Sequence, residues 1–411
     1  MADQTAHARL VQLADIRAAQ SLLAPVVHRT PVLHSRLFSQ MTGADVHLKL
    51  ESFQRTGSFK IRGAYNKMVT LSEAERAAGV ITASAGNHAQ GVALAAQLLG
   101  VPATIVMPLS ASLAKIAATE SYGATIELSG STYDEAYAQA VRLARQHGLI
   151  YVPAFDDPAI IAGQGTVGLE LMEQLPDVDL VIVPAGGGGL VAGIAVAVKS
   201  IRPSARVVAV QSSLFDTFAA SLKHRPPSPV TARSTVADGV AVQVPGALTL
   251  ELGRRLIDDA VTVDDEAICQ SIVLLLERTK VVVEGAGAVG LAALLSGGIR
   301  AHGQKVAVVL SGGNIDINLM ARIIQHGLTT AGRYLMIRSR LLDRPGQLLG
   351  LIRLLADEGV NVLNIEHHRA GALLPVDEVE VLLTLETRDP AHCEHILTTL
   401  RQAGYEVERA R

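Results

Sequence analysis

Short runs of β-branched and other apolar residues alternate with longer helical patterns over most of this chain. The clearest runs are VITAS (Val80–Ser84), ATIVMP (Ala103–Pro108), LVIVPA (Leu180–Ala185) and VAVVLSGG (Val306–Gly313). Helical patterns lie at Asn87–Leu99, Thr132–Gln146, Gly189–Ser200 and Asp264–Arg278. Strands that alternate with helices form parallel sheets with helices packed on their faces. The sequence therefore predicts an α/β protein in which residues 1–328 form one domain of two lobes with a cleft between them.

The pattern changes near Arg333, where a smaller unit begins. Strand, helix, strand, strand, helix and strand are expected in turn at Tyr334–Leu342, Pro345–Gly359, Val360–Ala370, Glu378–Arg388, Ala391–Gly404 and Tyr405–Arg409. This βαββαβ order is the ferredoxin-like layout. We therefore expect a second domain at residues 329–411, with HGLTTAGR (His326–Arg333) as the candidate linker.

Composition argues against several classes of protein. Only 18% of the 411 residues are charged, the formal net charge is −3 and no long basic run occurs, so nucleic acid and membrane surfaces are not expected partners. The two cysteines, Cys269 and Cys393, lack metal-ligand spacing, so neither a disulfide scaffold nor a metal site is expected. Asp3 and Asp15 interrupt the start of the chain, which therefore lacks the apolar core of a secretory signal. A cytoplasmic protein is expected.

One uncharged stretch, Leu180–Val198, has nearly the length of a membrane span. Pro184 and four consecutive glycines interrupt it, and these residues break a spanning helix. A strand, a loop and a buried helix are the better interpretation.

The first motif that indicates chemistry is Ser58-Phe59-Lys60, at the start of a helical pattern. A helix N-terminus disfavours a cation, so the pKa of Lys60 should be lowered there. A neutral amine can form a Schiff base or act as a general base. The alternative is an ordinary surface lysine.

The second motif is SAGNHAQG (Ser84–Gly91), where a strand turns into a helix. Its small residues leave backbone N–H groups open, so a carboxylate or phosphate could bind there. Asn87 offers a neutral donor suited to a phenolic oxygen. A simple turn with Asn87 as the helix N-cap is the alternative.

The third motif is GGGGL (Gly186–Leu190), which precedes a helix. Successive N–H groups and the positive helix end can bind a phosphate there. No Lys-Ser or Lys-Thr pair follows, so the motif is not a nucleotide P-loop. A phosphate-binding role is favoured over a purely structural loop, because each glycine costs backbone entropy.

The fourth motif is SGGN (Ser311–Asn314), after an apolar strand. Parallel sheets bind ligands at the carboxyl ends of their strands, where Ser311 lies. A simple ST-turn is an equally good interpretation.

A further glycine pattern, GAGAVG (Gly285–Gly290), matches the dinucleotide fingerprint. The acidic residue expected about 20 positions later is missing, because Leu310 and Ser311 occupy that region. These glycines are therefore interpreted as allowing close packing of a helix on a sheet.

Taken together and in this order, the four motifs resemble those of the fold-type II pyridoxal-phosphate enzymes, which share a tryptophan synthase β-like fold. The resemblance is closest to threonine ammonia-lyases (threonine dehydratases) and their serine racemase relatives, and it covers nearly the whole chain. It implies pyridoxal 5′-phosphate as the cofactor and conversion of L-threonine to 2-oxobutanoate and ammonia, with L-serine giving pyruvate. Serine racemase and hydroxyaspartate dehydratase are alternatives on the same scaffold. A non-catalytic amino-acid sensor is a third, against which intact Lys60, Asn87 and Ser311 count.

The resemblance also implies residue roles. Lys60 would bind the cofactor covalently with Phe59 beside its ring, Asn87 would bind its O3′, and Ser311 would face its pyridine nitrogen. The phosphate would be held by Gly186, Gly187, Gly188, Gly189 and Leu190, and Gly239 would be a backbone neighbour of the cofactor. The substrate carboxylate would bind at Ser84, Gly86, Asn87 and His88.

Two departures favour the lyase. Serine racemases resemble SSGNH at the second motif and use the second serine as an acid/base, whereas this chain has Ala85. Their divalent-cation site corresponds to Gln211, Phe215 and Thr217 here, none of which is a carboxylate, although Asp216 is adjacent. No metal is therefore expected.

The tail resembles an ACT domain, a module that binds small amino acids at subunit interfaces. The matching residues are the turn Leu342–Gly346 and the strand around Asn361–Asn364. Leu342, Gly346 and Asn364 are the expected effector contacts, with isoleucine or valine as effector and a homodimer or homotetramer as the assembly. Isoleucine biosynthesis and a catabolic role are both open as the pathway. A dimerisation module without a ligand is the alternative.

Overall fold

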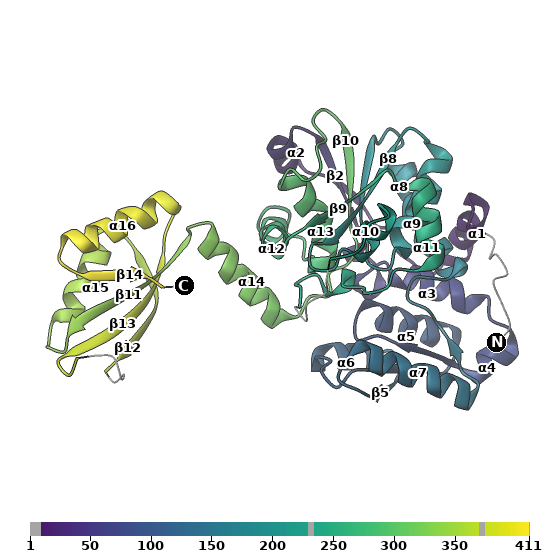
Figure 1. The fold of residues 1–411 in the computed structure, drawn as a ribbon, viewed down its shortest axis with the longest axis horizontal. Coiled ribbons are helices and arrows are strands. Elements are labelled where there is room, and N and C mark those ends of the chain that lie inside the picture. The colour runs from purple at the N-terminus through teal and green to yellow at the C-terminus, as the bar shows by residue number, and fades with distance from the viewer. Residues whose placement is uncertain (1–9, 229–233, 370–374, 411) are drawn as a thin grey trace. The chain divides into compact units, whose positions relative to one another are not determined.

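The computed structural model describes residues 10–228, 234–369 and 375–410. Contacts divide the chain into two compact units, Met1–Asp316 and Ile317–Arg411 (Figure 1). The boundary was expected at residue 328, but helix α14 (Ile317–Thr330) groups with the second unit. The expected lack of a secretory signal depends partly on residues 1–9, which lie outside the described residues.

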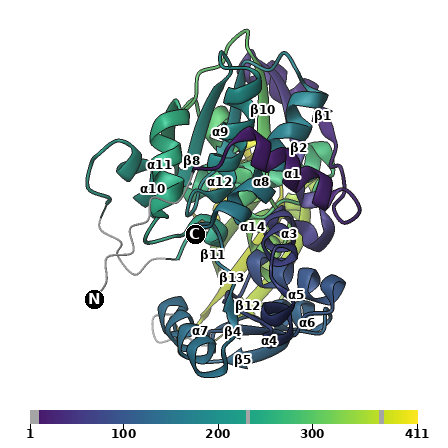
Figure 2. The ribbon, with the colours of Figure 1, turned by 90° about the vertical axis from the view of Figure 1, so that its right-hand side faces the viewer.

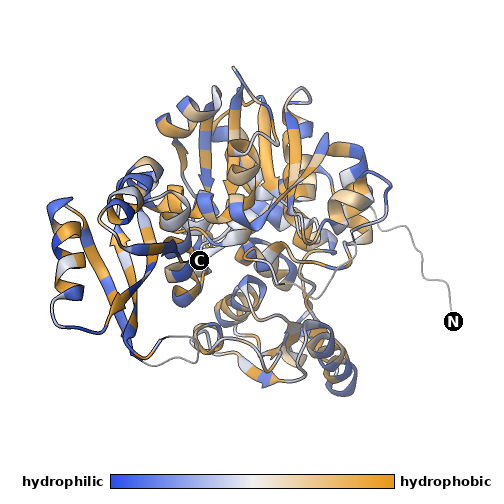
Figure 3. Cartoon of the chain, turned by 60° about the vertical axis from the view of Figure 1, so that its left-hand side comes forward, coloured by the Kyte–Doolittle hydropathy of each residue, from blue (hydrophilic) through white to orange (hydrophobic). Residues whose placement is uncertain are grey.

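The larger lobe of the first unit is built on a six-stranded sheet in the order β1-β2-β10-β7-β8-β9. Every neighbouring pair is parallel except β1 and β2. Its central strands are largely hydrophobic (Figure 3), as burial of a parallel sheet on both faces requires. The strands are β1 (Val32–His34), β2 (Asp45–Leu50), β7 (Leu180–Pro184), β8 (Arg206–Ser212), β9 (Asp259–Val263) and β10 (Lys305–Leu310).

The smaller lobe contains a four-stranded parallel sheet in the order β5-β4-β3-β6. Figure 2 shows this lobe with helices α4 to α7 around its sheet, apart from the six-stranded sheet. The strands are β3 (Val80–Ala83), β4 (Ala103–Met107), β5 (Thr125–Leu128) and β6 (Ile150–Tyr151). The predicted two-lobed α/β organisation is therefore present.

Helices cover the sheets of both lobes. They are α1 (Leu13–Leu23), α2 (Arg36–Thr42), α3 (Lys60–Val69), α4 (Glu73–Ala78), α5 (Asn87–Leu99), α6 (Leu113–Glu120), α7 (Tyr133–His147), α8 (Pro158–Gln174), α9 (Gly189–Ile201), α10 (Thr217–Leu222), α11 (Ala247–Leu256), α12 (Asp265–Leu274) and α13 (Gly285–Leu295). Short 3₁₀ turns include η1 (Glu51–Phe53), η2 (Arg55–Gly57) and η3 (Asp238–Val240). The helix predicted at Asp264–Arg278 is α12, which continues as a π-helical turn, Leu275–Thr279.

The GAGAVG glycines have the packing role expected of them. They form the start of α13, where a Cβ on Gly287 would lie 2.6 Å from the carbonyl oxygen of Gly312. A Cβ on Gly290 would lie 3.1 Å from Val308 of β10 and 3.2 Å from Ile182 of β7. Residues with side chains would therefore push α13 off the sheet.

The uncharged stretch Leu180–Val198 forms β7, the glycine loop and most of α9. Across the described ranges, no helix combines the length and the apolar character that crossing a membrane requires.

The second unit has a four-stranded antiparallel sheet in the order β12-β13-β11-β14, with two helices that follow β11 and β13. The predicted βαββαβ order is confirmed. Its elements after α14 are β11 (Tyr334–Leu342), α15 (Gln347–Asp357), β12 (Asn361–His368), β13 (Glu378–Glu386), α16 (Pro390–Gln402) and β14 (Glu406–Arg409). Ala370, the last residue of the expected third element, lies outside the described residues.

The prediction of a linker at His326–Arg333 was wrong. Residues 326–330 form the last part of α14, whose buried residues are Met320, Ile323 and Gly327. The helical spacing of these buried residues favours a helix more than the Thr and Gly residues favour a loop. The Thr and Gly residues mark only the end of the helix, where Gly332 has φ +68°.

Candidate functional site

Lys60 is the first residue of α3, and its side chain is half-buried. Its Nζ donates a hydrogen bond to the carbonyl oxygen of Ala154 (2.9 Å) and lies 5.2 Å from the centre of the Phe59 ring. Burial lowers the pKa of Lys60 to about 8, against the opposing charge of Glu284. The direction matches the prediction, although burial is the main cause. Neutral amine is therefore available near physiological pH.

The glycine loop Gly186–Gly189 connects β7 to α9. Gly188 has φ +96°, and a Cβ there would lie 2.2 Å from the ring of Phe218. A Cβ on Gly187 would lie 2.5 Å from the ring of Phe155, so a side chain fits at neither position. The first N–H groups of α9 have no acceptor within the helix and can bind an anion. Because Phe155 directly follows Ala154, this loop lies beside the Lys60 amine.

Asn87 opens α5, but it is not the N-cap, so that alternative was wrong. Gly86 occupies the cap position, and no side chain caps the helix. The Asn87 amide is instead held by tertiary contacts: its Nδ2 donates to Glu284 Oε1, and its Oδ1 accepts from Asn314 Nδ2 (2.7 Å). These two contacts hold the amide in one orientation.

Ser84 and His88 flank the start of α5 and have different surroundings. The Ser84 hydroxyl accepts a hydrogen bond from the Gly86 N–H (3.2 Å). The His88 ring is buried, with Nε2 3.0 Å from the carbonyl oxygen of Val152. Burial, assisted by the charge of Lys60, lowers the pKa of His88 to about 3, so the ring is neutral. Its backbone N–H, in the first turn of α5, is the group placed to bind a carboxylate.

Ser311 follows β10 and is 3% exposed. Its carbonyl oxygen accepts a hydrogen bond from the Phe59 N–H (3.2 Å), which ties the strand end to the residue before Lys60. Within the described residues its hydroxyl makes no hydrogen bond, and so no ST-turn. The hydroxyl can therefore bond to a ligand.

Glu284 is a residue of the site that sequence reasoning missed. It directly precedes α13 and is 5% exposed, and its carboxylate accepts the Asn87 hydrogen bond. Burial and the nearby Asp238 carboxylate raise the pKa of Glu284 to about 7. Asp238 is itself paired with Lys115 of α6 (2.8 Å). The only local signal was a charged residue inside the apolar stretch VVVEGAGAVG.

Gly239 and Leu190 complete the predicted set. The carbonyl oxygen of Gly239, in η3, would lie 3.1 Å from a Cβ on Gly186, so its backbone contacts the glycine loop. Leu190 is buried in the first turn of α9. The structure thus gathers an amine, an anion-binding helix start, an amide and a free buried hydroxyl. This donor set fits pyridoxal phosphate, which carries an aldehyde, a phosphate, a phenolic oxygen and a ring nitrogen.

The positions that correspond to a racemase cation site are hydrogen-bonded within the protein. Gln211 Oε1 accepts from the N–H groups of Phe218 and Ala219 at the start of α10. Asp216 accepts two hydrogen bonds from Ser228 and pairs with Arg225 (3.2 Å). In the described parts of the chain, no group of three or more His, Cys, Asp or Glu residues is arranged to hold a metal ion.

The expected effector residues do not meet within one chain. Gly346 has φ +95° and caps α15, close in sequence to Leu342 at the end of β11. Strand β13 pairs Leu342 with Glu378 and Asn364 with Thr384. These positions are roughly 20 Å apart along the strand at about 3.3 Å per residue.

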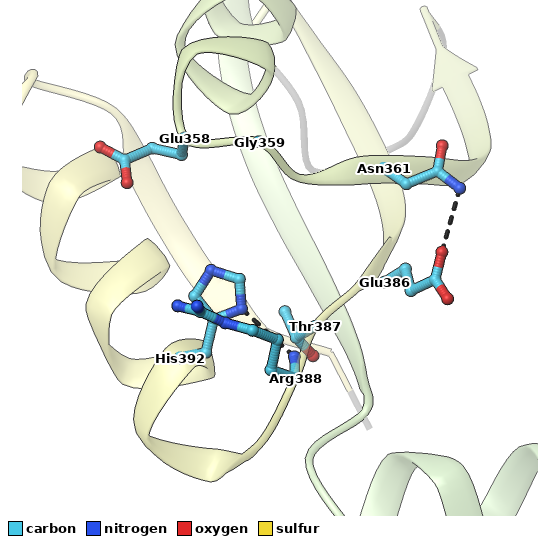
Figure 4. Close-up of a pocket in the computed structure, with 7 residues that line it drawn as sticks. All are labelled: Glu358, Gly359, Asn361, Glu386, Thr387, Arg388 and His392. Atoms are coloured by element: carbon cyan, nitrogen blue, oxygen red, sulfur yellow. Dashed lines mark hydrogen bonds between the residues drawn. The ribbon is translucent and has the colours of Figure 1, made fainter.

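The second unit also has a surface pocket of about 340 Å³ elsewhere (Figure 4). It lies at the start of β12 and the end of β13, and none of the expected effector residues lines it. The lining residues are Glu358, Gly359, Asn361, Glu386, Thr387, Arg388 and His392.

Comparisons with known proteins show which proteins this chain resembles. An L-threonine ammonia-lyase of Thermotoga maritima is 50% identical over 97% of this chain and 99% of its own length. The catabolic L-threonine dehydratase of Escherichia coli is 47% identical over 76% of this chain and 96% of its own length. The structure of maize serine racemase superimposes with a TM-score of 0.73 at 38% identity, over 78% of this chain and 99% of that one. Residues 23–312 match the family described as "Pyridoxal-phosphate dependent enzyme". The chain therefore belongs to the family of pyridoxal-phosphate-dependent enzymes.

Proposed function

We propose that this protein is an L-threonine ammonia-lyase that converts L-threonine to 2-oxobutanoate and ammonia and also converts L-serine to pyruvate. The observation that carries the proposal is the half-buried amine of Lys60 beside the glycine loop, near an α5 start preceded by Ala85, which cannot transfer a proton. The names of the Thermotoga maritima and Escherichia coli relatives support the same reaction.

The predicted residues would serve the cofactor and the substrate separately. Gly186–Gly189 and the start of α9 would hold the cofactor phosphate, Asn87 its O3′ and Ser311 its ring nitrogen. Bound pyridoxal phosphate supplies an electron-withdrawing ring conjugated to the substrate α-carbon. The N-terminal N–H groups of α5, with Ser84, would bind the substrate carboxylate and orient the α-carbon toward Lys60.

Lys60 is the base. Because burial holds its pKa near 8, a substantial part of its amine is neutral and can take the proton from the α-carbon. Loss of the β-hydroxyl as water, followed by hydrolysis, gives the 2-oxo acid and ammonia. Ser311 would place a neutral hydroxyl at the ring nitrogen. A hydroxyl keeps that nitrogen protonated less strongly than a carboxylate would, so the cofactor ring withdraws electrons less strongly. A ring of this kind favours elimination over transamination.

The similarity to maize serine racemase makes racemisation the second candidate. Racemisation needs a proton donor on the face of the α-carbon opposite the lysine. Ala85 offers only a methyl group there, packed against the core of the smaller lobe. Lyase activity is therefore favoured over racemase activity.

The experiment is steady-state turnover of L-threonine, L-serine and L-hydroxyaspartate by the purified protein, with 2-oxo acids detected and amino acids separated by chiral chromatography. We expect 2-oxobutanoate from L-threonine as the main product. D-Serine formed from L-serine as fast as pyruvate would assign the protein as a racemase. Turnover of hydroxyaspartate alone would assign the protein as a hydroxyaspartate dehydratase. If none of the three amino acids is turned over, the protein would be assigned as a non-catalytic sensor.

We propose that the second unit is an ACT-type domain that regulates the first through an amino-acid effector, isoleucine or valine. Leu342 and Gly346 are too far from Asn364 to share one ligand within a chain, so such a site needs two subunits. Apolar side chains on α15 and the edge strand β12 favour such pairing: Leu349 is 61%, Leu363 43% and Ile365 42% exposed. A homodimer or homotetramer is the proposed assembly. A cytoplasmic location stays a prediction.

A further inference from the structure

The turn before Lys60 has an unusual backbone. Thr56, in η2, has φ +64°, a left-handed conformation that residues with a side chain seldom adopt. Gly57 follows with φ +70°. Such conformations persist where surrounding contacts enforce them, and they occur frequently at functional sites. The contacts that enforce this one therefore influence where α3 and Lys60 begin.

The side chain of Asn314 contacts this turn directly. Its Nδ2 donates one hydrogen bond to the carbonyl oxygen of Thr56 (2.6 Å) and another to Oδ1 of Asn87 (2.7 Å). A Cβ on Gly57 would lie 2.4 Å from Asn314 Oδ1, so the amide is packed directly on the turn. Asn314 thus joins the turn before α3 to the first residue of α5.

Backbone contacts hold Asn314 itself in register with this turn. The Gly313 N–H donates to the carbonyl oxygen of Gly57 (2.9 Å), and Ser58 forms an isolated β-bridge with Gly312. The segment that carries Ser311 is therefore fixed to the segment that carries Lys60.

The hydrogen bonds determine which way the Asn87 amide points. The carbonyl oxygen of Thr56 can only accept, so the nitrogen of Asn314 must face it, and its second hydrogen needs another acceptor. That acceptor is the oxygen of Asn87, so the nitrogen of Asn87 faces the Glu284 carboxylate. With the opposite orientation, Asn87 would present a carbonyl oxygen to any acceptor in the site.

We propose that Asn314 is a positioning residue that clamps the turn before Lys60 and sets the orientation of the Asn87 amide. It thereby fixes the cofactor's attachment point and its O3′ partner relative to each other. This inference rests on the proposed cofactor contacts of Lys60 and Asn87. Both hydrogens of the Asn314 amide nitrogen are used within the protein, on Thr56 and Asn87.

The test is Asn314→Asp, which keeps the size of the side chain but removes both donors. The new carboxylate would face two oxygens, so the Asn87 amide should rotate and the turn should relax. The rotated Asn87 amide would no longer donate to O3′, and loss of one hydrogen bond to a charged oxygen predicts a dissociation constant for pyridoxal phosphate that is roughly tenfold to a hundredfold higher. The absorbance maximum of the bound cofactor should shift as well. Asn314→Ala, which removes the donors without repulsion, should weaken binding less.

The matched control is Asn66→Asp. Asn66 is buried in α3, and its Nδ2 donates to the carbonyl oxygen of Ala159 (2.7 Å), away from Asn87 and Thr56. This variant should lose thermal stability but keep the wild-type cofactor affinity and absorbance maximum. Thermal unfolding of each cofactor-free variant establishes that it is folded.

Wild-type affinity and absorbance in a folded Asn314→Asp variant would overturn the proposal. Equal weakening in Asn314→Asp and Asn66→Asp would also overturn it, because the effect would then be general destabilisation. A wild-type protein that does not attach the cofactor through Lys60 would instead contradict the proposed function. The three results are therefore distinguishable.

Discussion

Replacing Glu284 by glutamine should remove a large pH dependence of stability from the cofactor-free protein. Burial and Asp238 raise the pKa of Glu284 from its ordinary 4.5 to about 7 in the fold. One pKa unit corresponds to about 1.4 kcal/mol, so the ionised carboxyl is about 3 kcal/mol less favourable in the folded than in the unfolded chain. The folded state thus binds this proton more tightly. Its contribution to stability is fully present below about pH 4.5, declines as pH rises, and is lost above about pH 7.

The assay is urea unfolding of wild type and Glu284→Gln between pH 5 and pH 8. Glutamine can still accept the hydrogen bond from Asn87 but cannot ionise. Relative to the variant, wild type should lose roughly 2–3 kcal/mol of unfolding free energy across this range. Parallel curves for the two proteins would refute the reasoning, because the carboxyl would then titrate alike in both states.

Glu75→Gln is the matched control for this assay. Glu75 is exposed at the start of α4, where hydrogen bonds from Ser72 lower its pKa below 4.5. It is therefore ionised in both the folded and unfolded chain above pH 5. Its difference from wild type should be constant between pH 5 and pH 8.

Four further substitutions or truncations test the proposed site and domain roles. Lys60→Ala should abolish the absorbance of the covalently attached cofactor and nearly all threonine turnover; retained turnover would exclude Lys60 as the base. Ser311→Ala should keep the cofactor but lose about 1 kcal/mol of stabilisation, roughly fivefold in turnover, and an unchanged rate would mean that Ser311 does not touch the ring. Wild type should form no D-serine from L-serine if Ala85 prevents racemisation, whereas chiral chromatography of an Ala85→Ser variant should detect it. Truncation after Thr330 should leave turnover measurable, since the Escherichia coli relative corresponds to 76% of this chain, and abolish any response to isoleucine or valine. In the full-length protein, effector binding should change substrate affinity by roughly 5–150-fold, a coupling free energy of about 1–3 kcal/mol. A truncated enzyme that still gives the full response would exclude the tail as the sensor.

The parts of the site that depend on local backbone could be predicted from the sequence. The glycines at 186–189 indicate a loop that admits no side chain, and the neighbouring Phe155 and Phe218 rings explain why. Strands β7 and β10 could be recognised from their apolar runs, because the strands of a parallel sheet are buried on both faces. They end at Pro184 and Leu310. The βαββαβ order of the tail follows from alternation between period-2 and helical patterns.

The parts that depend on distant segments could not be predicted. Glu284 and Asn87 are 197 positions apart, and no local pattern indicates that one orients the other. The same holds for Asn314, whose partner Thr56 is 258 positions away. The side-chain direction of His88 is likewise set by the carbonyl oxygen of Val152, across the sheet of the smaller lobe.

The central claim is that Lys60 carries the cofactor, and peptide mapping after borohydride reduction of the holoenzyme tests it most directly. Reduction makes the lysine–cofactor bond permanent and should block tryptic cleavage after Lys60. Mass spectrometry should then find the cofactor on the peptide Thr56–Arg62, which keeps Lys60 uncleaved between Arg55 and Arg62. Cofactor found on any other lysine, with cleavage after Lys60 intact, would contradict the account.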